Sequence, residues 1–71
     1  ERSILLRMGF SSIEAKAIVE NISENNLLSK GAGHCVYVVS KEKGLEIHEA
    51  GLKLQDSEYI DFLMEYFKIY E

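Results

Sequence analysis

Apolar residues recur at helical spacing in the first part of the chain. Residues 1–8 predict a short helix, with Gly9 placed to take the left-handed conformation after its last turn. Ser11 followed by Glu14 matches a capping box, which predicts that a second helix begins at residue 12. Its apolar residues recur one turn apart: Ile13, Ala17, Ile18 and Ile22. We expect this helix to reach residue 25 and favour an end near Ser29; a break at the two asparagines before it is the alternative.

After the glycine-rich turn at residues 31–33, the apolar pattern changes to a period of two. Residues 34–40 are rich in β-forming side chains, and residues 45–49 alternate apolar with polar, so both are predicted strands. Residues 41–44 fit a type I turn with Gly44 in the left-handed bulge position. The pattern therefore predicts a β-hairpin, with residues 52–55 as a candidate short third strand. A loop longer by one residue would regroup its faces, and both registers stay open.

The last part of the chain returns to helical spacing and is unusually aromatic. Asp56 or Ser57 is the expected N-cap of a helix that runs to the end, and five of the seven aromatic residues lie in it. Apolar side chains cover about half of its circumference, more than the ~100° stripe that a surface helix needs. The surplus predicts a protein-binding face, for which the candidate residues are Tyr59, Phe62, Leu63, Tyr66, Phe67 and Tyr70. Within this set Leu63 and Phe67, together with Ile60, are expected to close the chain's own core.

These elements predict the class of fold. Two N-terminal helices, a hairpin and a C-terminal amphipathic helix describe a small α+β domain with one layer of sheet. Its 71 residues are expected to form one domain, residues 1–71, near the lower size limit for folding without disulfides or metals.

Charge adds a second feature to the C-terminal helix. The chain has a net charge of −4, and residues 56–71 hold five acids against Lys68. Glu58, Asp61 and Glu65 share one helix face, which predicts an acidic ridge that faces a basic partner. Nucleic-acid binding is disfavoured because no basic stripe exists. An association with membranes is also excluded from the prediction, because no apolar run approaches the ~20 residues that span a bilayer.

Residues with reactive side chains are few. Cys35 is the sole cysteine, which favours a reducing, cytoplasmic location. His34, Cys35 and His48 are the only metal-type ligands besides carboxylates, and they cannot converge from a regular hairpin. Thiol catalysis would need Cys35 beside a histidine base, which only the shifted hairpin register allows. We therefore predict no metal, no cofactor and no enzymatic activity.

Residues 6–18, around Met8, Gly9 and Phe10, resemble two families over about a dozen of the 71 residues. They are similar to the first loop of ubiquitin-associated domains, which implies a third helix and no sheet. They also resemble the start of winged-helix regulators, which implies a basic recognition helix, yet residues 21–30 contain one basic residue. A helix that ends at a glycine and is followed by a helix with a capping box is common, so neither resemblance is taken to show membership of the family.

The predicted function combines these observations. We expect a non-enzymatic interaction domain, a small regulator, inhibitor or adaptor, that binds another protein or forms a homodimer through its last helix. The alternative is a winged-helix-like transcriptional regulator, or a fragment of one, that dimerises through the same helix.

Overall fold

The computed structural model describes residues 2–71, and all of its regular elements are helices. Five α-helices and one 3₁₀ turn follow each other along the chain: α1 (Arg2–Arg7), α2 (Ser12–Glu24), η1 (Leu28–Lys30), α3 (Ala32–Lys43), α4 (Ile47–Gln55) and α5 (Ile60–Tyr70). The predicted α+β fold is therefore wrong, since residues 2–71 contain no strand.

The first predicted strand lies within α3, and the second falls in the start of α4 apart from Leu45 and Glu46, which precede it. The burial pattern shows why these segments are helical. In α3 the buried side chains of Ala32, Cys35, Val36 and Val39 recur at steps of three and four residues from Ala32 and again from Val39, which places them on one side of a helix. The valines have β propensity, but packing against the core overrides so weak a preference. In α4, which includes the candidate third strand, Ile47, Ala50, Gly51 and Leu54 show the same helical spacing.

Gly44 was predicted in the right conformation but in the wrong element. It is left-handed, with φ 67° and ψ 37°, and it ends α3 rather than a strand. The backbone N–H of Leu45 donates to Ser40 O at 3.0 Å, and the Ser40 hydroxyl donates to Leu45 O at 2.6 Å. This is a Schellman-type helix end, which satisfies carbonyl groups that the last turn leaves unpaired.

The N-terminal predictions agree with the structure more closely. The Ser11 hydroxyl accepts from Glu14 N–H and the Glu14 carboxylate accepts from Ser11 N–H, so the predicted capping box is confirmed. Gly9 has φ 102° after α1, as predicted. The favoured end of α2 near residue 29 is wrong: the helix ends at Glu24, and Asn26 turns the chain with φ 60°.

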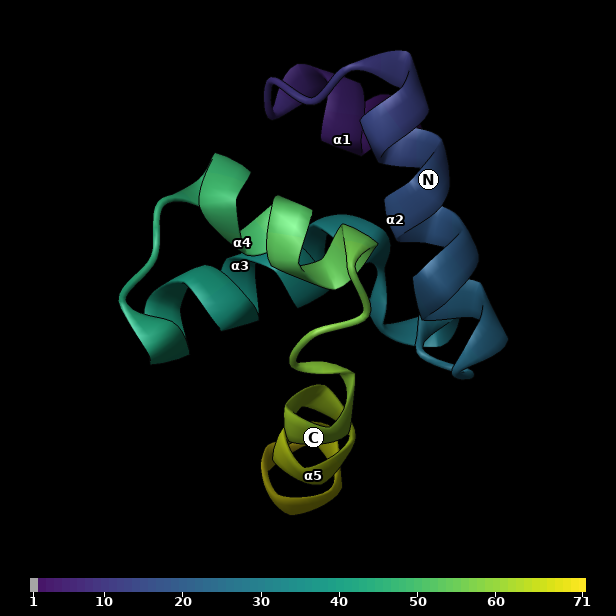
Figure 1. Ribbon diagram of the computed structural model, residues 1–71. Coiled ribbons are helices and arrows are strands. Elements are labelled where there is room, and N and C mark those ends of the chain that lie inside the picture. The colour runs from purple at the N-terminus through teal and green to yellow at the C-terminus, as the bar shows by residue number, and fades with distance from the viewer. Residues whose placement is uncertain (1) are drawn as a thin grey trace.

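The chain has one apolar core, to which all five α-helices contribute. Its completely buried members include Leu5, Ile18, Ile22, Val36, Val39, Leu54 and Leu63. Helix α4 packs against α2 and α3, whereas α5 packs against α3 and lies beyond the other helices, at the far end from α1 (Figure 1).

Gly51 allows α2 and α4 to pack closely. A β-carbon at this position would clash with the ring of Phe10 and would come within 3.2 Å of Ile18 Cδ1. Two hydrogen bonds, here called the polar tie, also join α2 to α4. The Asn21 side-chain amide donates to Leu54 O at 3.0 Å and to Gln55 O at 2.7 Å. Both carbonyls lie in the last turn of α4, where helices leave carbonyl groups unpaired; Leu54 O also accepts from the backbone N–H of Ser57 at 3.0 Å.

The aromatic face of helix α5

Helix α5 is divided between the core and the surface. Ile60, Leu63 and Phe67 are buried in the chain's own core, as their helical spacing led us to expect. Two residues of the predicted binding face, Leu63 and Phe67, are therefore covered within this chain. The other four, Tyr59, Phe62, Tyr66 and Tyr70, remain at least partly exposed.

These four side chains form a continuous aromatic row along α5. Ring centroids are 6.4 Å apart between Tyr59 and Phe62, 5.9 Å between Phe62 and Tyr66, and 4.9 Å between Tyr66 and Tyr70. Such separations are typical of interacting aromatic pairs. Exposure is greatest at the C-terminal end, where 69% of Tyr70 is accessible to solvent.

The N-terminal end of the aromatic row is covered by a lysine from α3. Lys43 Nζ lies 4.3 Å from the centroid of the Phe62 ring and 5.1 Å from that of Tyr59. An ammonium group over an aromatic face is attracted by the ring quadrupole. The start of α5 is thus held to the end of α3 by a charged contact as well as by apolar packing.

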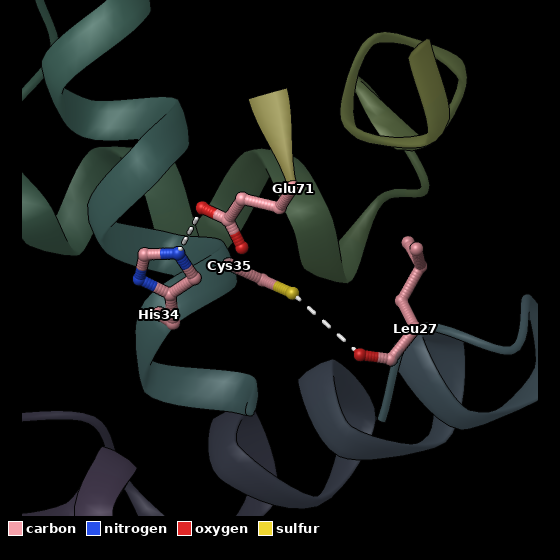
Figure 2. A network of polar contacts seen from close by, with 4 residues as sticks. All are labelled: Leu27, His34, Cys35 and Glu71. Carbon is pink, nitrogen blue, oxygen red and sulfur yellow. Dashed lines mark hydrogen bonds and ion pairs between the residues drawn. The ribbon is translucent and has the colours of Figure 1, made fainter. Parts of the chain in front are cut away.

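A second set of contacts holds the other end of α5. The His34 ring stacks on Phe67 with centroids 5.8 Å apart, and its Nε2 lies 2.9 Å from Glu71 Oε2. Figure 2 shows this pair beside Cys35, whose Sγ lies 4.0 Å from the carbonyl oxygen of Leu27. His34 therefore fastens the C-terminal end of the helix, while the neighbouring Cys35 belongs to the core.

The acidic ridge of Glu58, Asp61 and Glu65 is exposed, but the prediction that all three share one helix face is wrong, because Glu58 lies in the turn before α5. Glu58 pairs with Lys53 and Glu65 with Lys68, each at 3.6 Å, and Asp61 has no ion pair within residues 2–71. Exposed pairs of this kind contribute little energy because water screens them. Two of the three carboxylates of the ridge therefore have a lysine beside them, in pairs that water weakens.

The histidines and the cysteine do not form a reactive cluster. His48 stacks on Phe10 at 5.2 Å and its Nε2 lies 3.6 Å from Glu14 Oε2, whereas His34 contacts Phe67 and Glu71 of the C-terminal part of the chain. Within residues 2–71 no three His, Cys, Asp or Glu side chains are placed to hold a metal ion. The same residues enclose no pocket, and none of their helices is both long and apolar enough to cross a membrane.

Comparison with known proteins decides the family. A family model described as D-ornithine 4,5-aminomutase alpha-subunit matches residues 1–67. The chain belongs to this family. It is also 54% identical over 68 residues to D-ornithine 4,5-aminomutase subunit alpha of Acetoanaerobium sticklandii (strain ATCC 12662). That match covers 96% of this chain and 56% of the relative, so the chain spans about half the length of the relative it matches.

Membership of the aminomutase alpha-subunit family corrects the functional predictions. A regulator, inhibitor or adaptor is the wrong class, and so is a winged-helix regulator, because the family is a component of an enzyme. The prediction of no enzymatic activity is wrong for the same reason. These errors arose because an enzyme subunit without a catalytic motif of its own has the same sequence features as a binding domain.

Three side chains that matter for this face were not among the predicted binding residues. Ile69 is 65% exposed and lies between the aromatic row and the acidic ridge, and Met64 is 39% exposed on the other flank of α5. The spacing of Ile69 from Phe62 and Tyr66, seven and three residues, was the signal available for it. Lys43 gave no signal, because its contact depends on the fold of α3.

The start of α5 also differs from the prediction. Neither Asp56 nor Ser57 caps the helix; its N-cap is Tyr59, which has φ 65° and makes no side-chain cap hydrogen bond. Ser57 has φ 65° as well. Two left-handed non-glycine residues within three positions make the connection from α4 to α5 a strained one.

Proposed function

We propose that this chain is part of the alpha subunit of a D-ornithine 4,5-aminomutase and that it acts in this enzyme by binding another subunit. The name of the relative supplies the reaction class, transfer of an amino group between two neighbouring carbons of D-ornithine, and the word subunit implies an assembly. The observation that carries the proposal is the 54% identity over 96% of the chain.

We further propose that the chain binds its partner through the aromatic row. Large aromatic side chains dominate the energetics of interfaces because they bury much area at a low cost in conformational entropy. On α5 the Tyr66 ring contacts the ring of buried Phe67, with centroids 5.6 Å apart, so the row is joined to the core of the chain. Tyrosine hydroxyl groups at its edge are able to meet water or polar groups of a partner.

The position of the acidic ridge also favours this surface of α5 as the one that binds the partner. Charges next to an apolar contact accelerate encounter with a partner of opposite sign and exclude partners of like sign. We propose that Glu58, Asp61 and Glu65 have this role.

The first experiment measures assembly and activity together. The full-length alpha subunit that contains this sequence is mixed with the purified second subunit of the same aminomutase, and D-ornithine conversion is followed with and without it. We expect a stable complex and conversion that depends on both subunits. If the two chains elute separately and D-ornithine conversion is the same without the alpha subunit, the proposed function is wrong.

A matched pair of variants then tests the binding face. Tyr70→Glu places a charge on the aromatic row, and Ile13→Glu places the same charge on α2 at a residue that is 79% exposed. We expect Tyr70→Glu to weaken the complex at least about tenfold, as loss of an interface anchor does, and Ile13→Glu to leave it unchanged. Equal effects of both variants would move the interface away from α5.

The predicted homodimer is tested by the same preparations. Sedimentation of the alpha subunit alone reports whether a second copy occupies the aromatic row before the other subunit is added. Location in the cytoplasm remains a prediction, based on the sole cysteine of the chain.

A further inference from the structure

The aromatic row is not equally available along its length. At its N-terminal end, Lys43 lies over the Phe62 and Tyr59 rings at 4.3 and 5.1 Å, so these two half-buried rings already have a partner within the chain. At its C-terminal end Tyr70 is 69% exposed and Ile69 is 65% exposed, next to Tyr66. Apolar area that a partner can newly bury is therefore concentrated in the last two turns of α5.

The exposed apolar residues of these two turns have the spacing of a helix that enters a groove. Tyr66, Ile69 and Tyr70 are three and four residues apart, so they project from the same side of the helix in consecutive turns. Amphipathic helices that dock into apolar grooves present their anchors at this spacing. Met64, on the opposite flank, does not belong to the set.

The acids lie along one edge of this anchor set. Glu65 is one turn before Ile69 and borders the exposed apolar side chains, and Asp61 continues the same edge one turn further towards the start of α5. Asp61 has no ion pair within residues 2–71, and the pair from Glu65 to Lys68 is exposed at 3.6 Å. A partner that covers Tyr66, Ile69 and Tyr70 would have to bring its own rim close to these carboxylates.

We infer that the surface that receives α5 is an apolar groove of the other aminomutase subunit whose rim carries lysine or arginine side chains beside Asp61 and Glu65. This inference rests on the proposed function and adds the chemistry of the partner surface and the position of the contact. Desolvating the ridge against an uncharged or acidic rim would cost free energy, whereas a basic rim compensates it and steers the encounter.

Charge reversal on two surfaces tests the basic rim. Asp61→Lys with Glu65→Lys is compared with Glu20→Lys with Glu24→Lys, which makes the same change in net charge on exposed residues of α2. Association and dissociation rates with the other subunit are measured at low and high salt. We expect the ridge variant to associate about tenfold more slowly at low salt, with a smaller difference at high salt, and the α2 variant to behave as the wild type.

Truncations on the same helix test the position of the contact. We expect Ile69→Ala and Tyr70→Ala each to weaken the complex about tenfold, whereas Met64→Ala, a similar loss of apolar atoms on the other flank, changes the affinity less than about twofold. All three residues are exposed, so circular dichroism should show an unchanged helix content for each.

The outcomes separate the inference from the proposed function. If the wild-type subunits do not bind, both are wrong. If they bind but the ridge variant associates as fast as the wild type, or both charge-reversed variants slow equally, the basic rim is wrong while the assembly stands. If Ile69→Ala and Tyr70→Ala abolish only self-association of the alpha subunit, the groove belongs to a second copy and the inference is overturned.

Discussion

Helix α5 and the pair formed by α2 and α4 differ in how they use their apolar residues. Between α2 and α4, Gly51 lets Phe10 and Ile18 approach the helix, and the Asn21 amide satisfies carbonyls at its end. Helix α5 is richer in large apolar residues, yet it buries only one side and is fastened at its ends by Lys43 and His34. The difference shows that the helix with the largest apolar side chains in a small protein need not be the one that buries most of them.

Gly51→Ala should have the largest effect and tests the close packing of α2 and α4. The new β-carbon would overlap the Phe10 ring, and we expect a loss of about 3 kcal/mol in the free energy of unfolding, measured with urea. Gly33→Ala is the control, because its β-carbon would come within 3.1 Å of Ile4 Cγ1, the branch of an exposed side chain that is able to move. If both substitutions had a small and equal effect, Gly51 would not be required for the close packing of α2 and α4.

Asn21→Ala should have the next largest effect. It leaves the carbonyls of Leu54 and Gln55 without the side-chain donor, and we expect a loss of about 2 kcal/mol in the free energy of unfolding. Ser23→Ala, on the exposed side of the same helix, is expected to change stability by less than about 0.5 kcal/mol. If thermal unfolding shows the two variants to be equally stable, the polar tie does not stabilise the pair of helices.

The connection to α5 is expected to respond in the opposite direction. Ser57→Gly removes the penalty of a side chain in the left-handed region, and we expect a gain of up to about 1 kcal/mol. Glu58→Gly, at the neighbouring position, should give no gain, because Glu58 is not among the residues with positive φ. A gain in Glu58→Gly and none in Ser57→Gly, measured by urea unfolding, would contradict the strained connection.

Tyr70→Ala should have the smallest effect on the isolated chain. The residue is mostly exposed, so we expect a change below about 0.5 kcal/mol in the free energy of unfolding. Together with a large loss of binding, this would make the end of α5 a surface kept for a partner. A large loss of stability would instead assign Tyr70 to the core.

The sequence predicted those parts of the structure whose signals are local. The capping box of Ser11 and Glu14 and the turn at Gly9 follow from contacts between near neighbours, and the division of α5 between core and surface follows from the helical spacing of its apolar residues. Helices α3 and α4 were missed because runs such as residues 36–39 favour strands locally. Only the burial of Ala32, Cys35, Val36 and Val39 along one face indicates a helix. Tertiary packing provides that information.

The candidate site was predictable to a similar extent. Most of the aromatic row and of the acidic ridge could be read from the composition of residues 56–71, because all of their members except Glu58 and Tyr59 lie in one helix. The contact of Lys43 with Phe62 and the role of Ile69 as a neighbour of the row could not, since both depend on where α3 ends and on which side of α5 is buried. The role in an aminomutase could not be derived from any motif of the chain.

Because Cys35 is buried, the rate at which its thiol is modified can report local opening of the protein. Its thiol is inaccessible in the folded chain and lies on α3, the helix that supports α5. A thiol reagent can modify it only when α3 is uncovered, so the rate of modification measures how often this happens. Because the chain has one cysteine, every modified molecule reports the same event. The decrease in the modification rate when the other subunit is added would measure how strongly assembly holds α5 against α3.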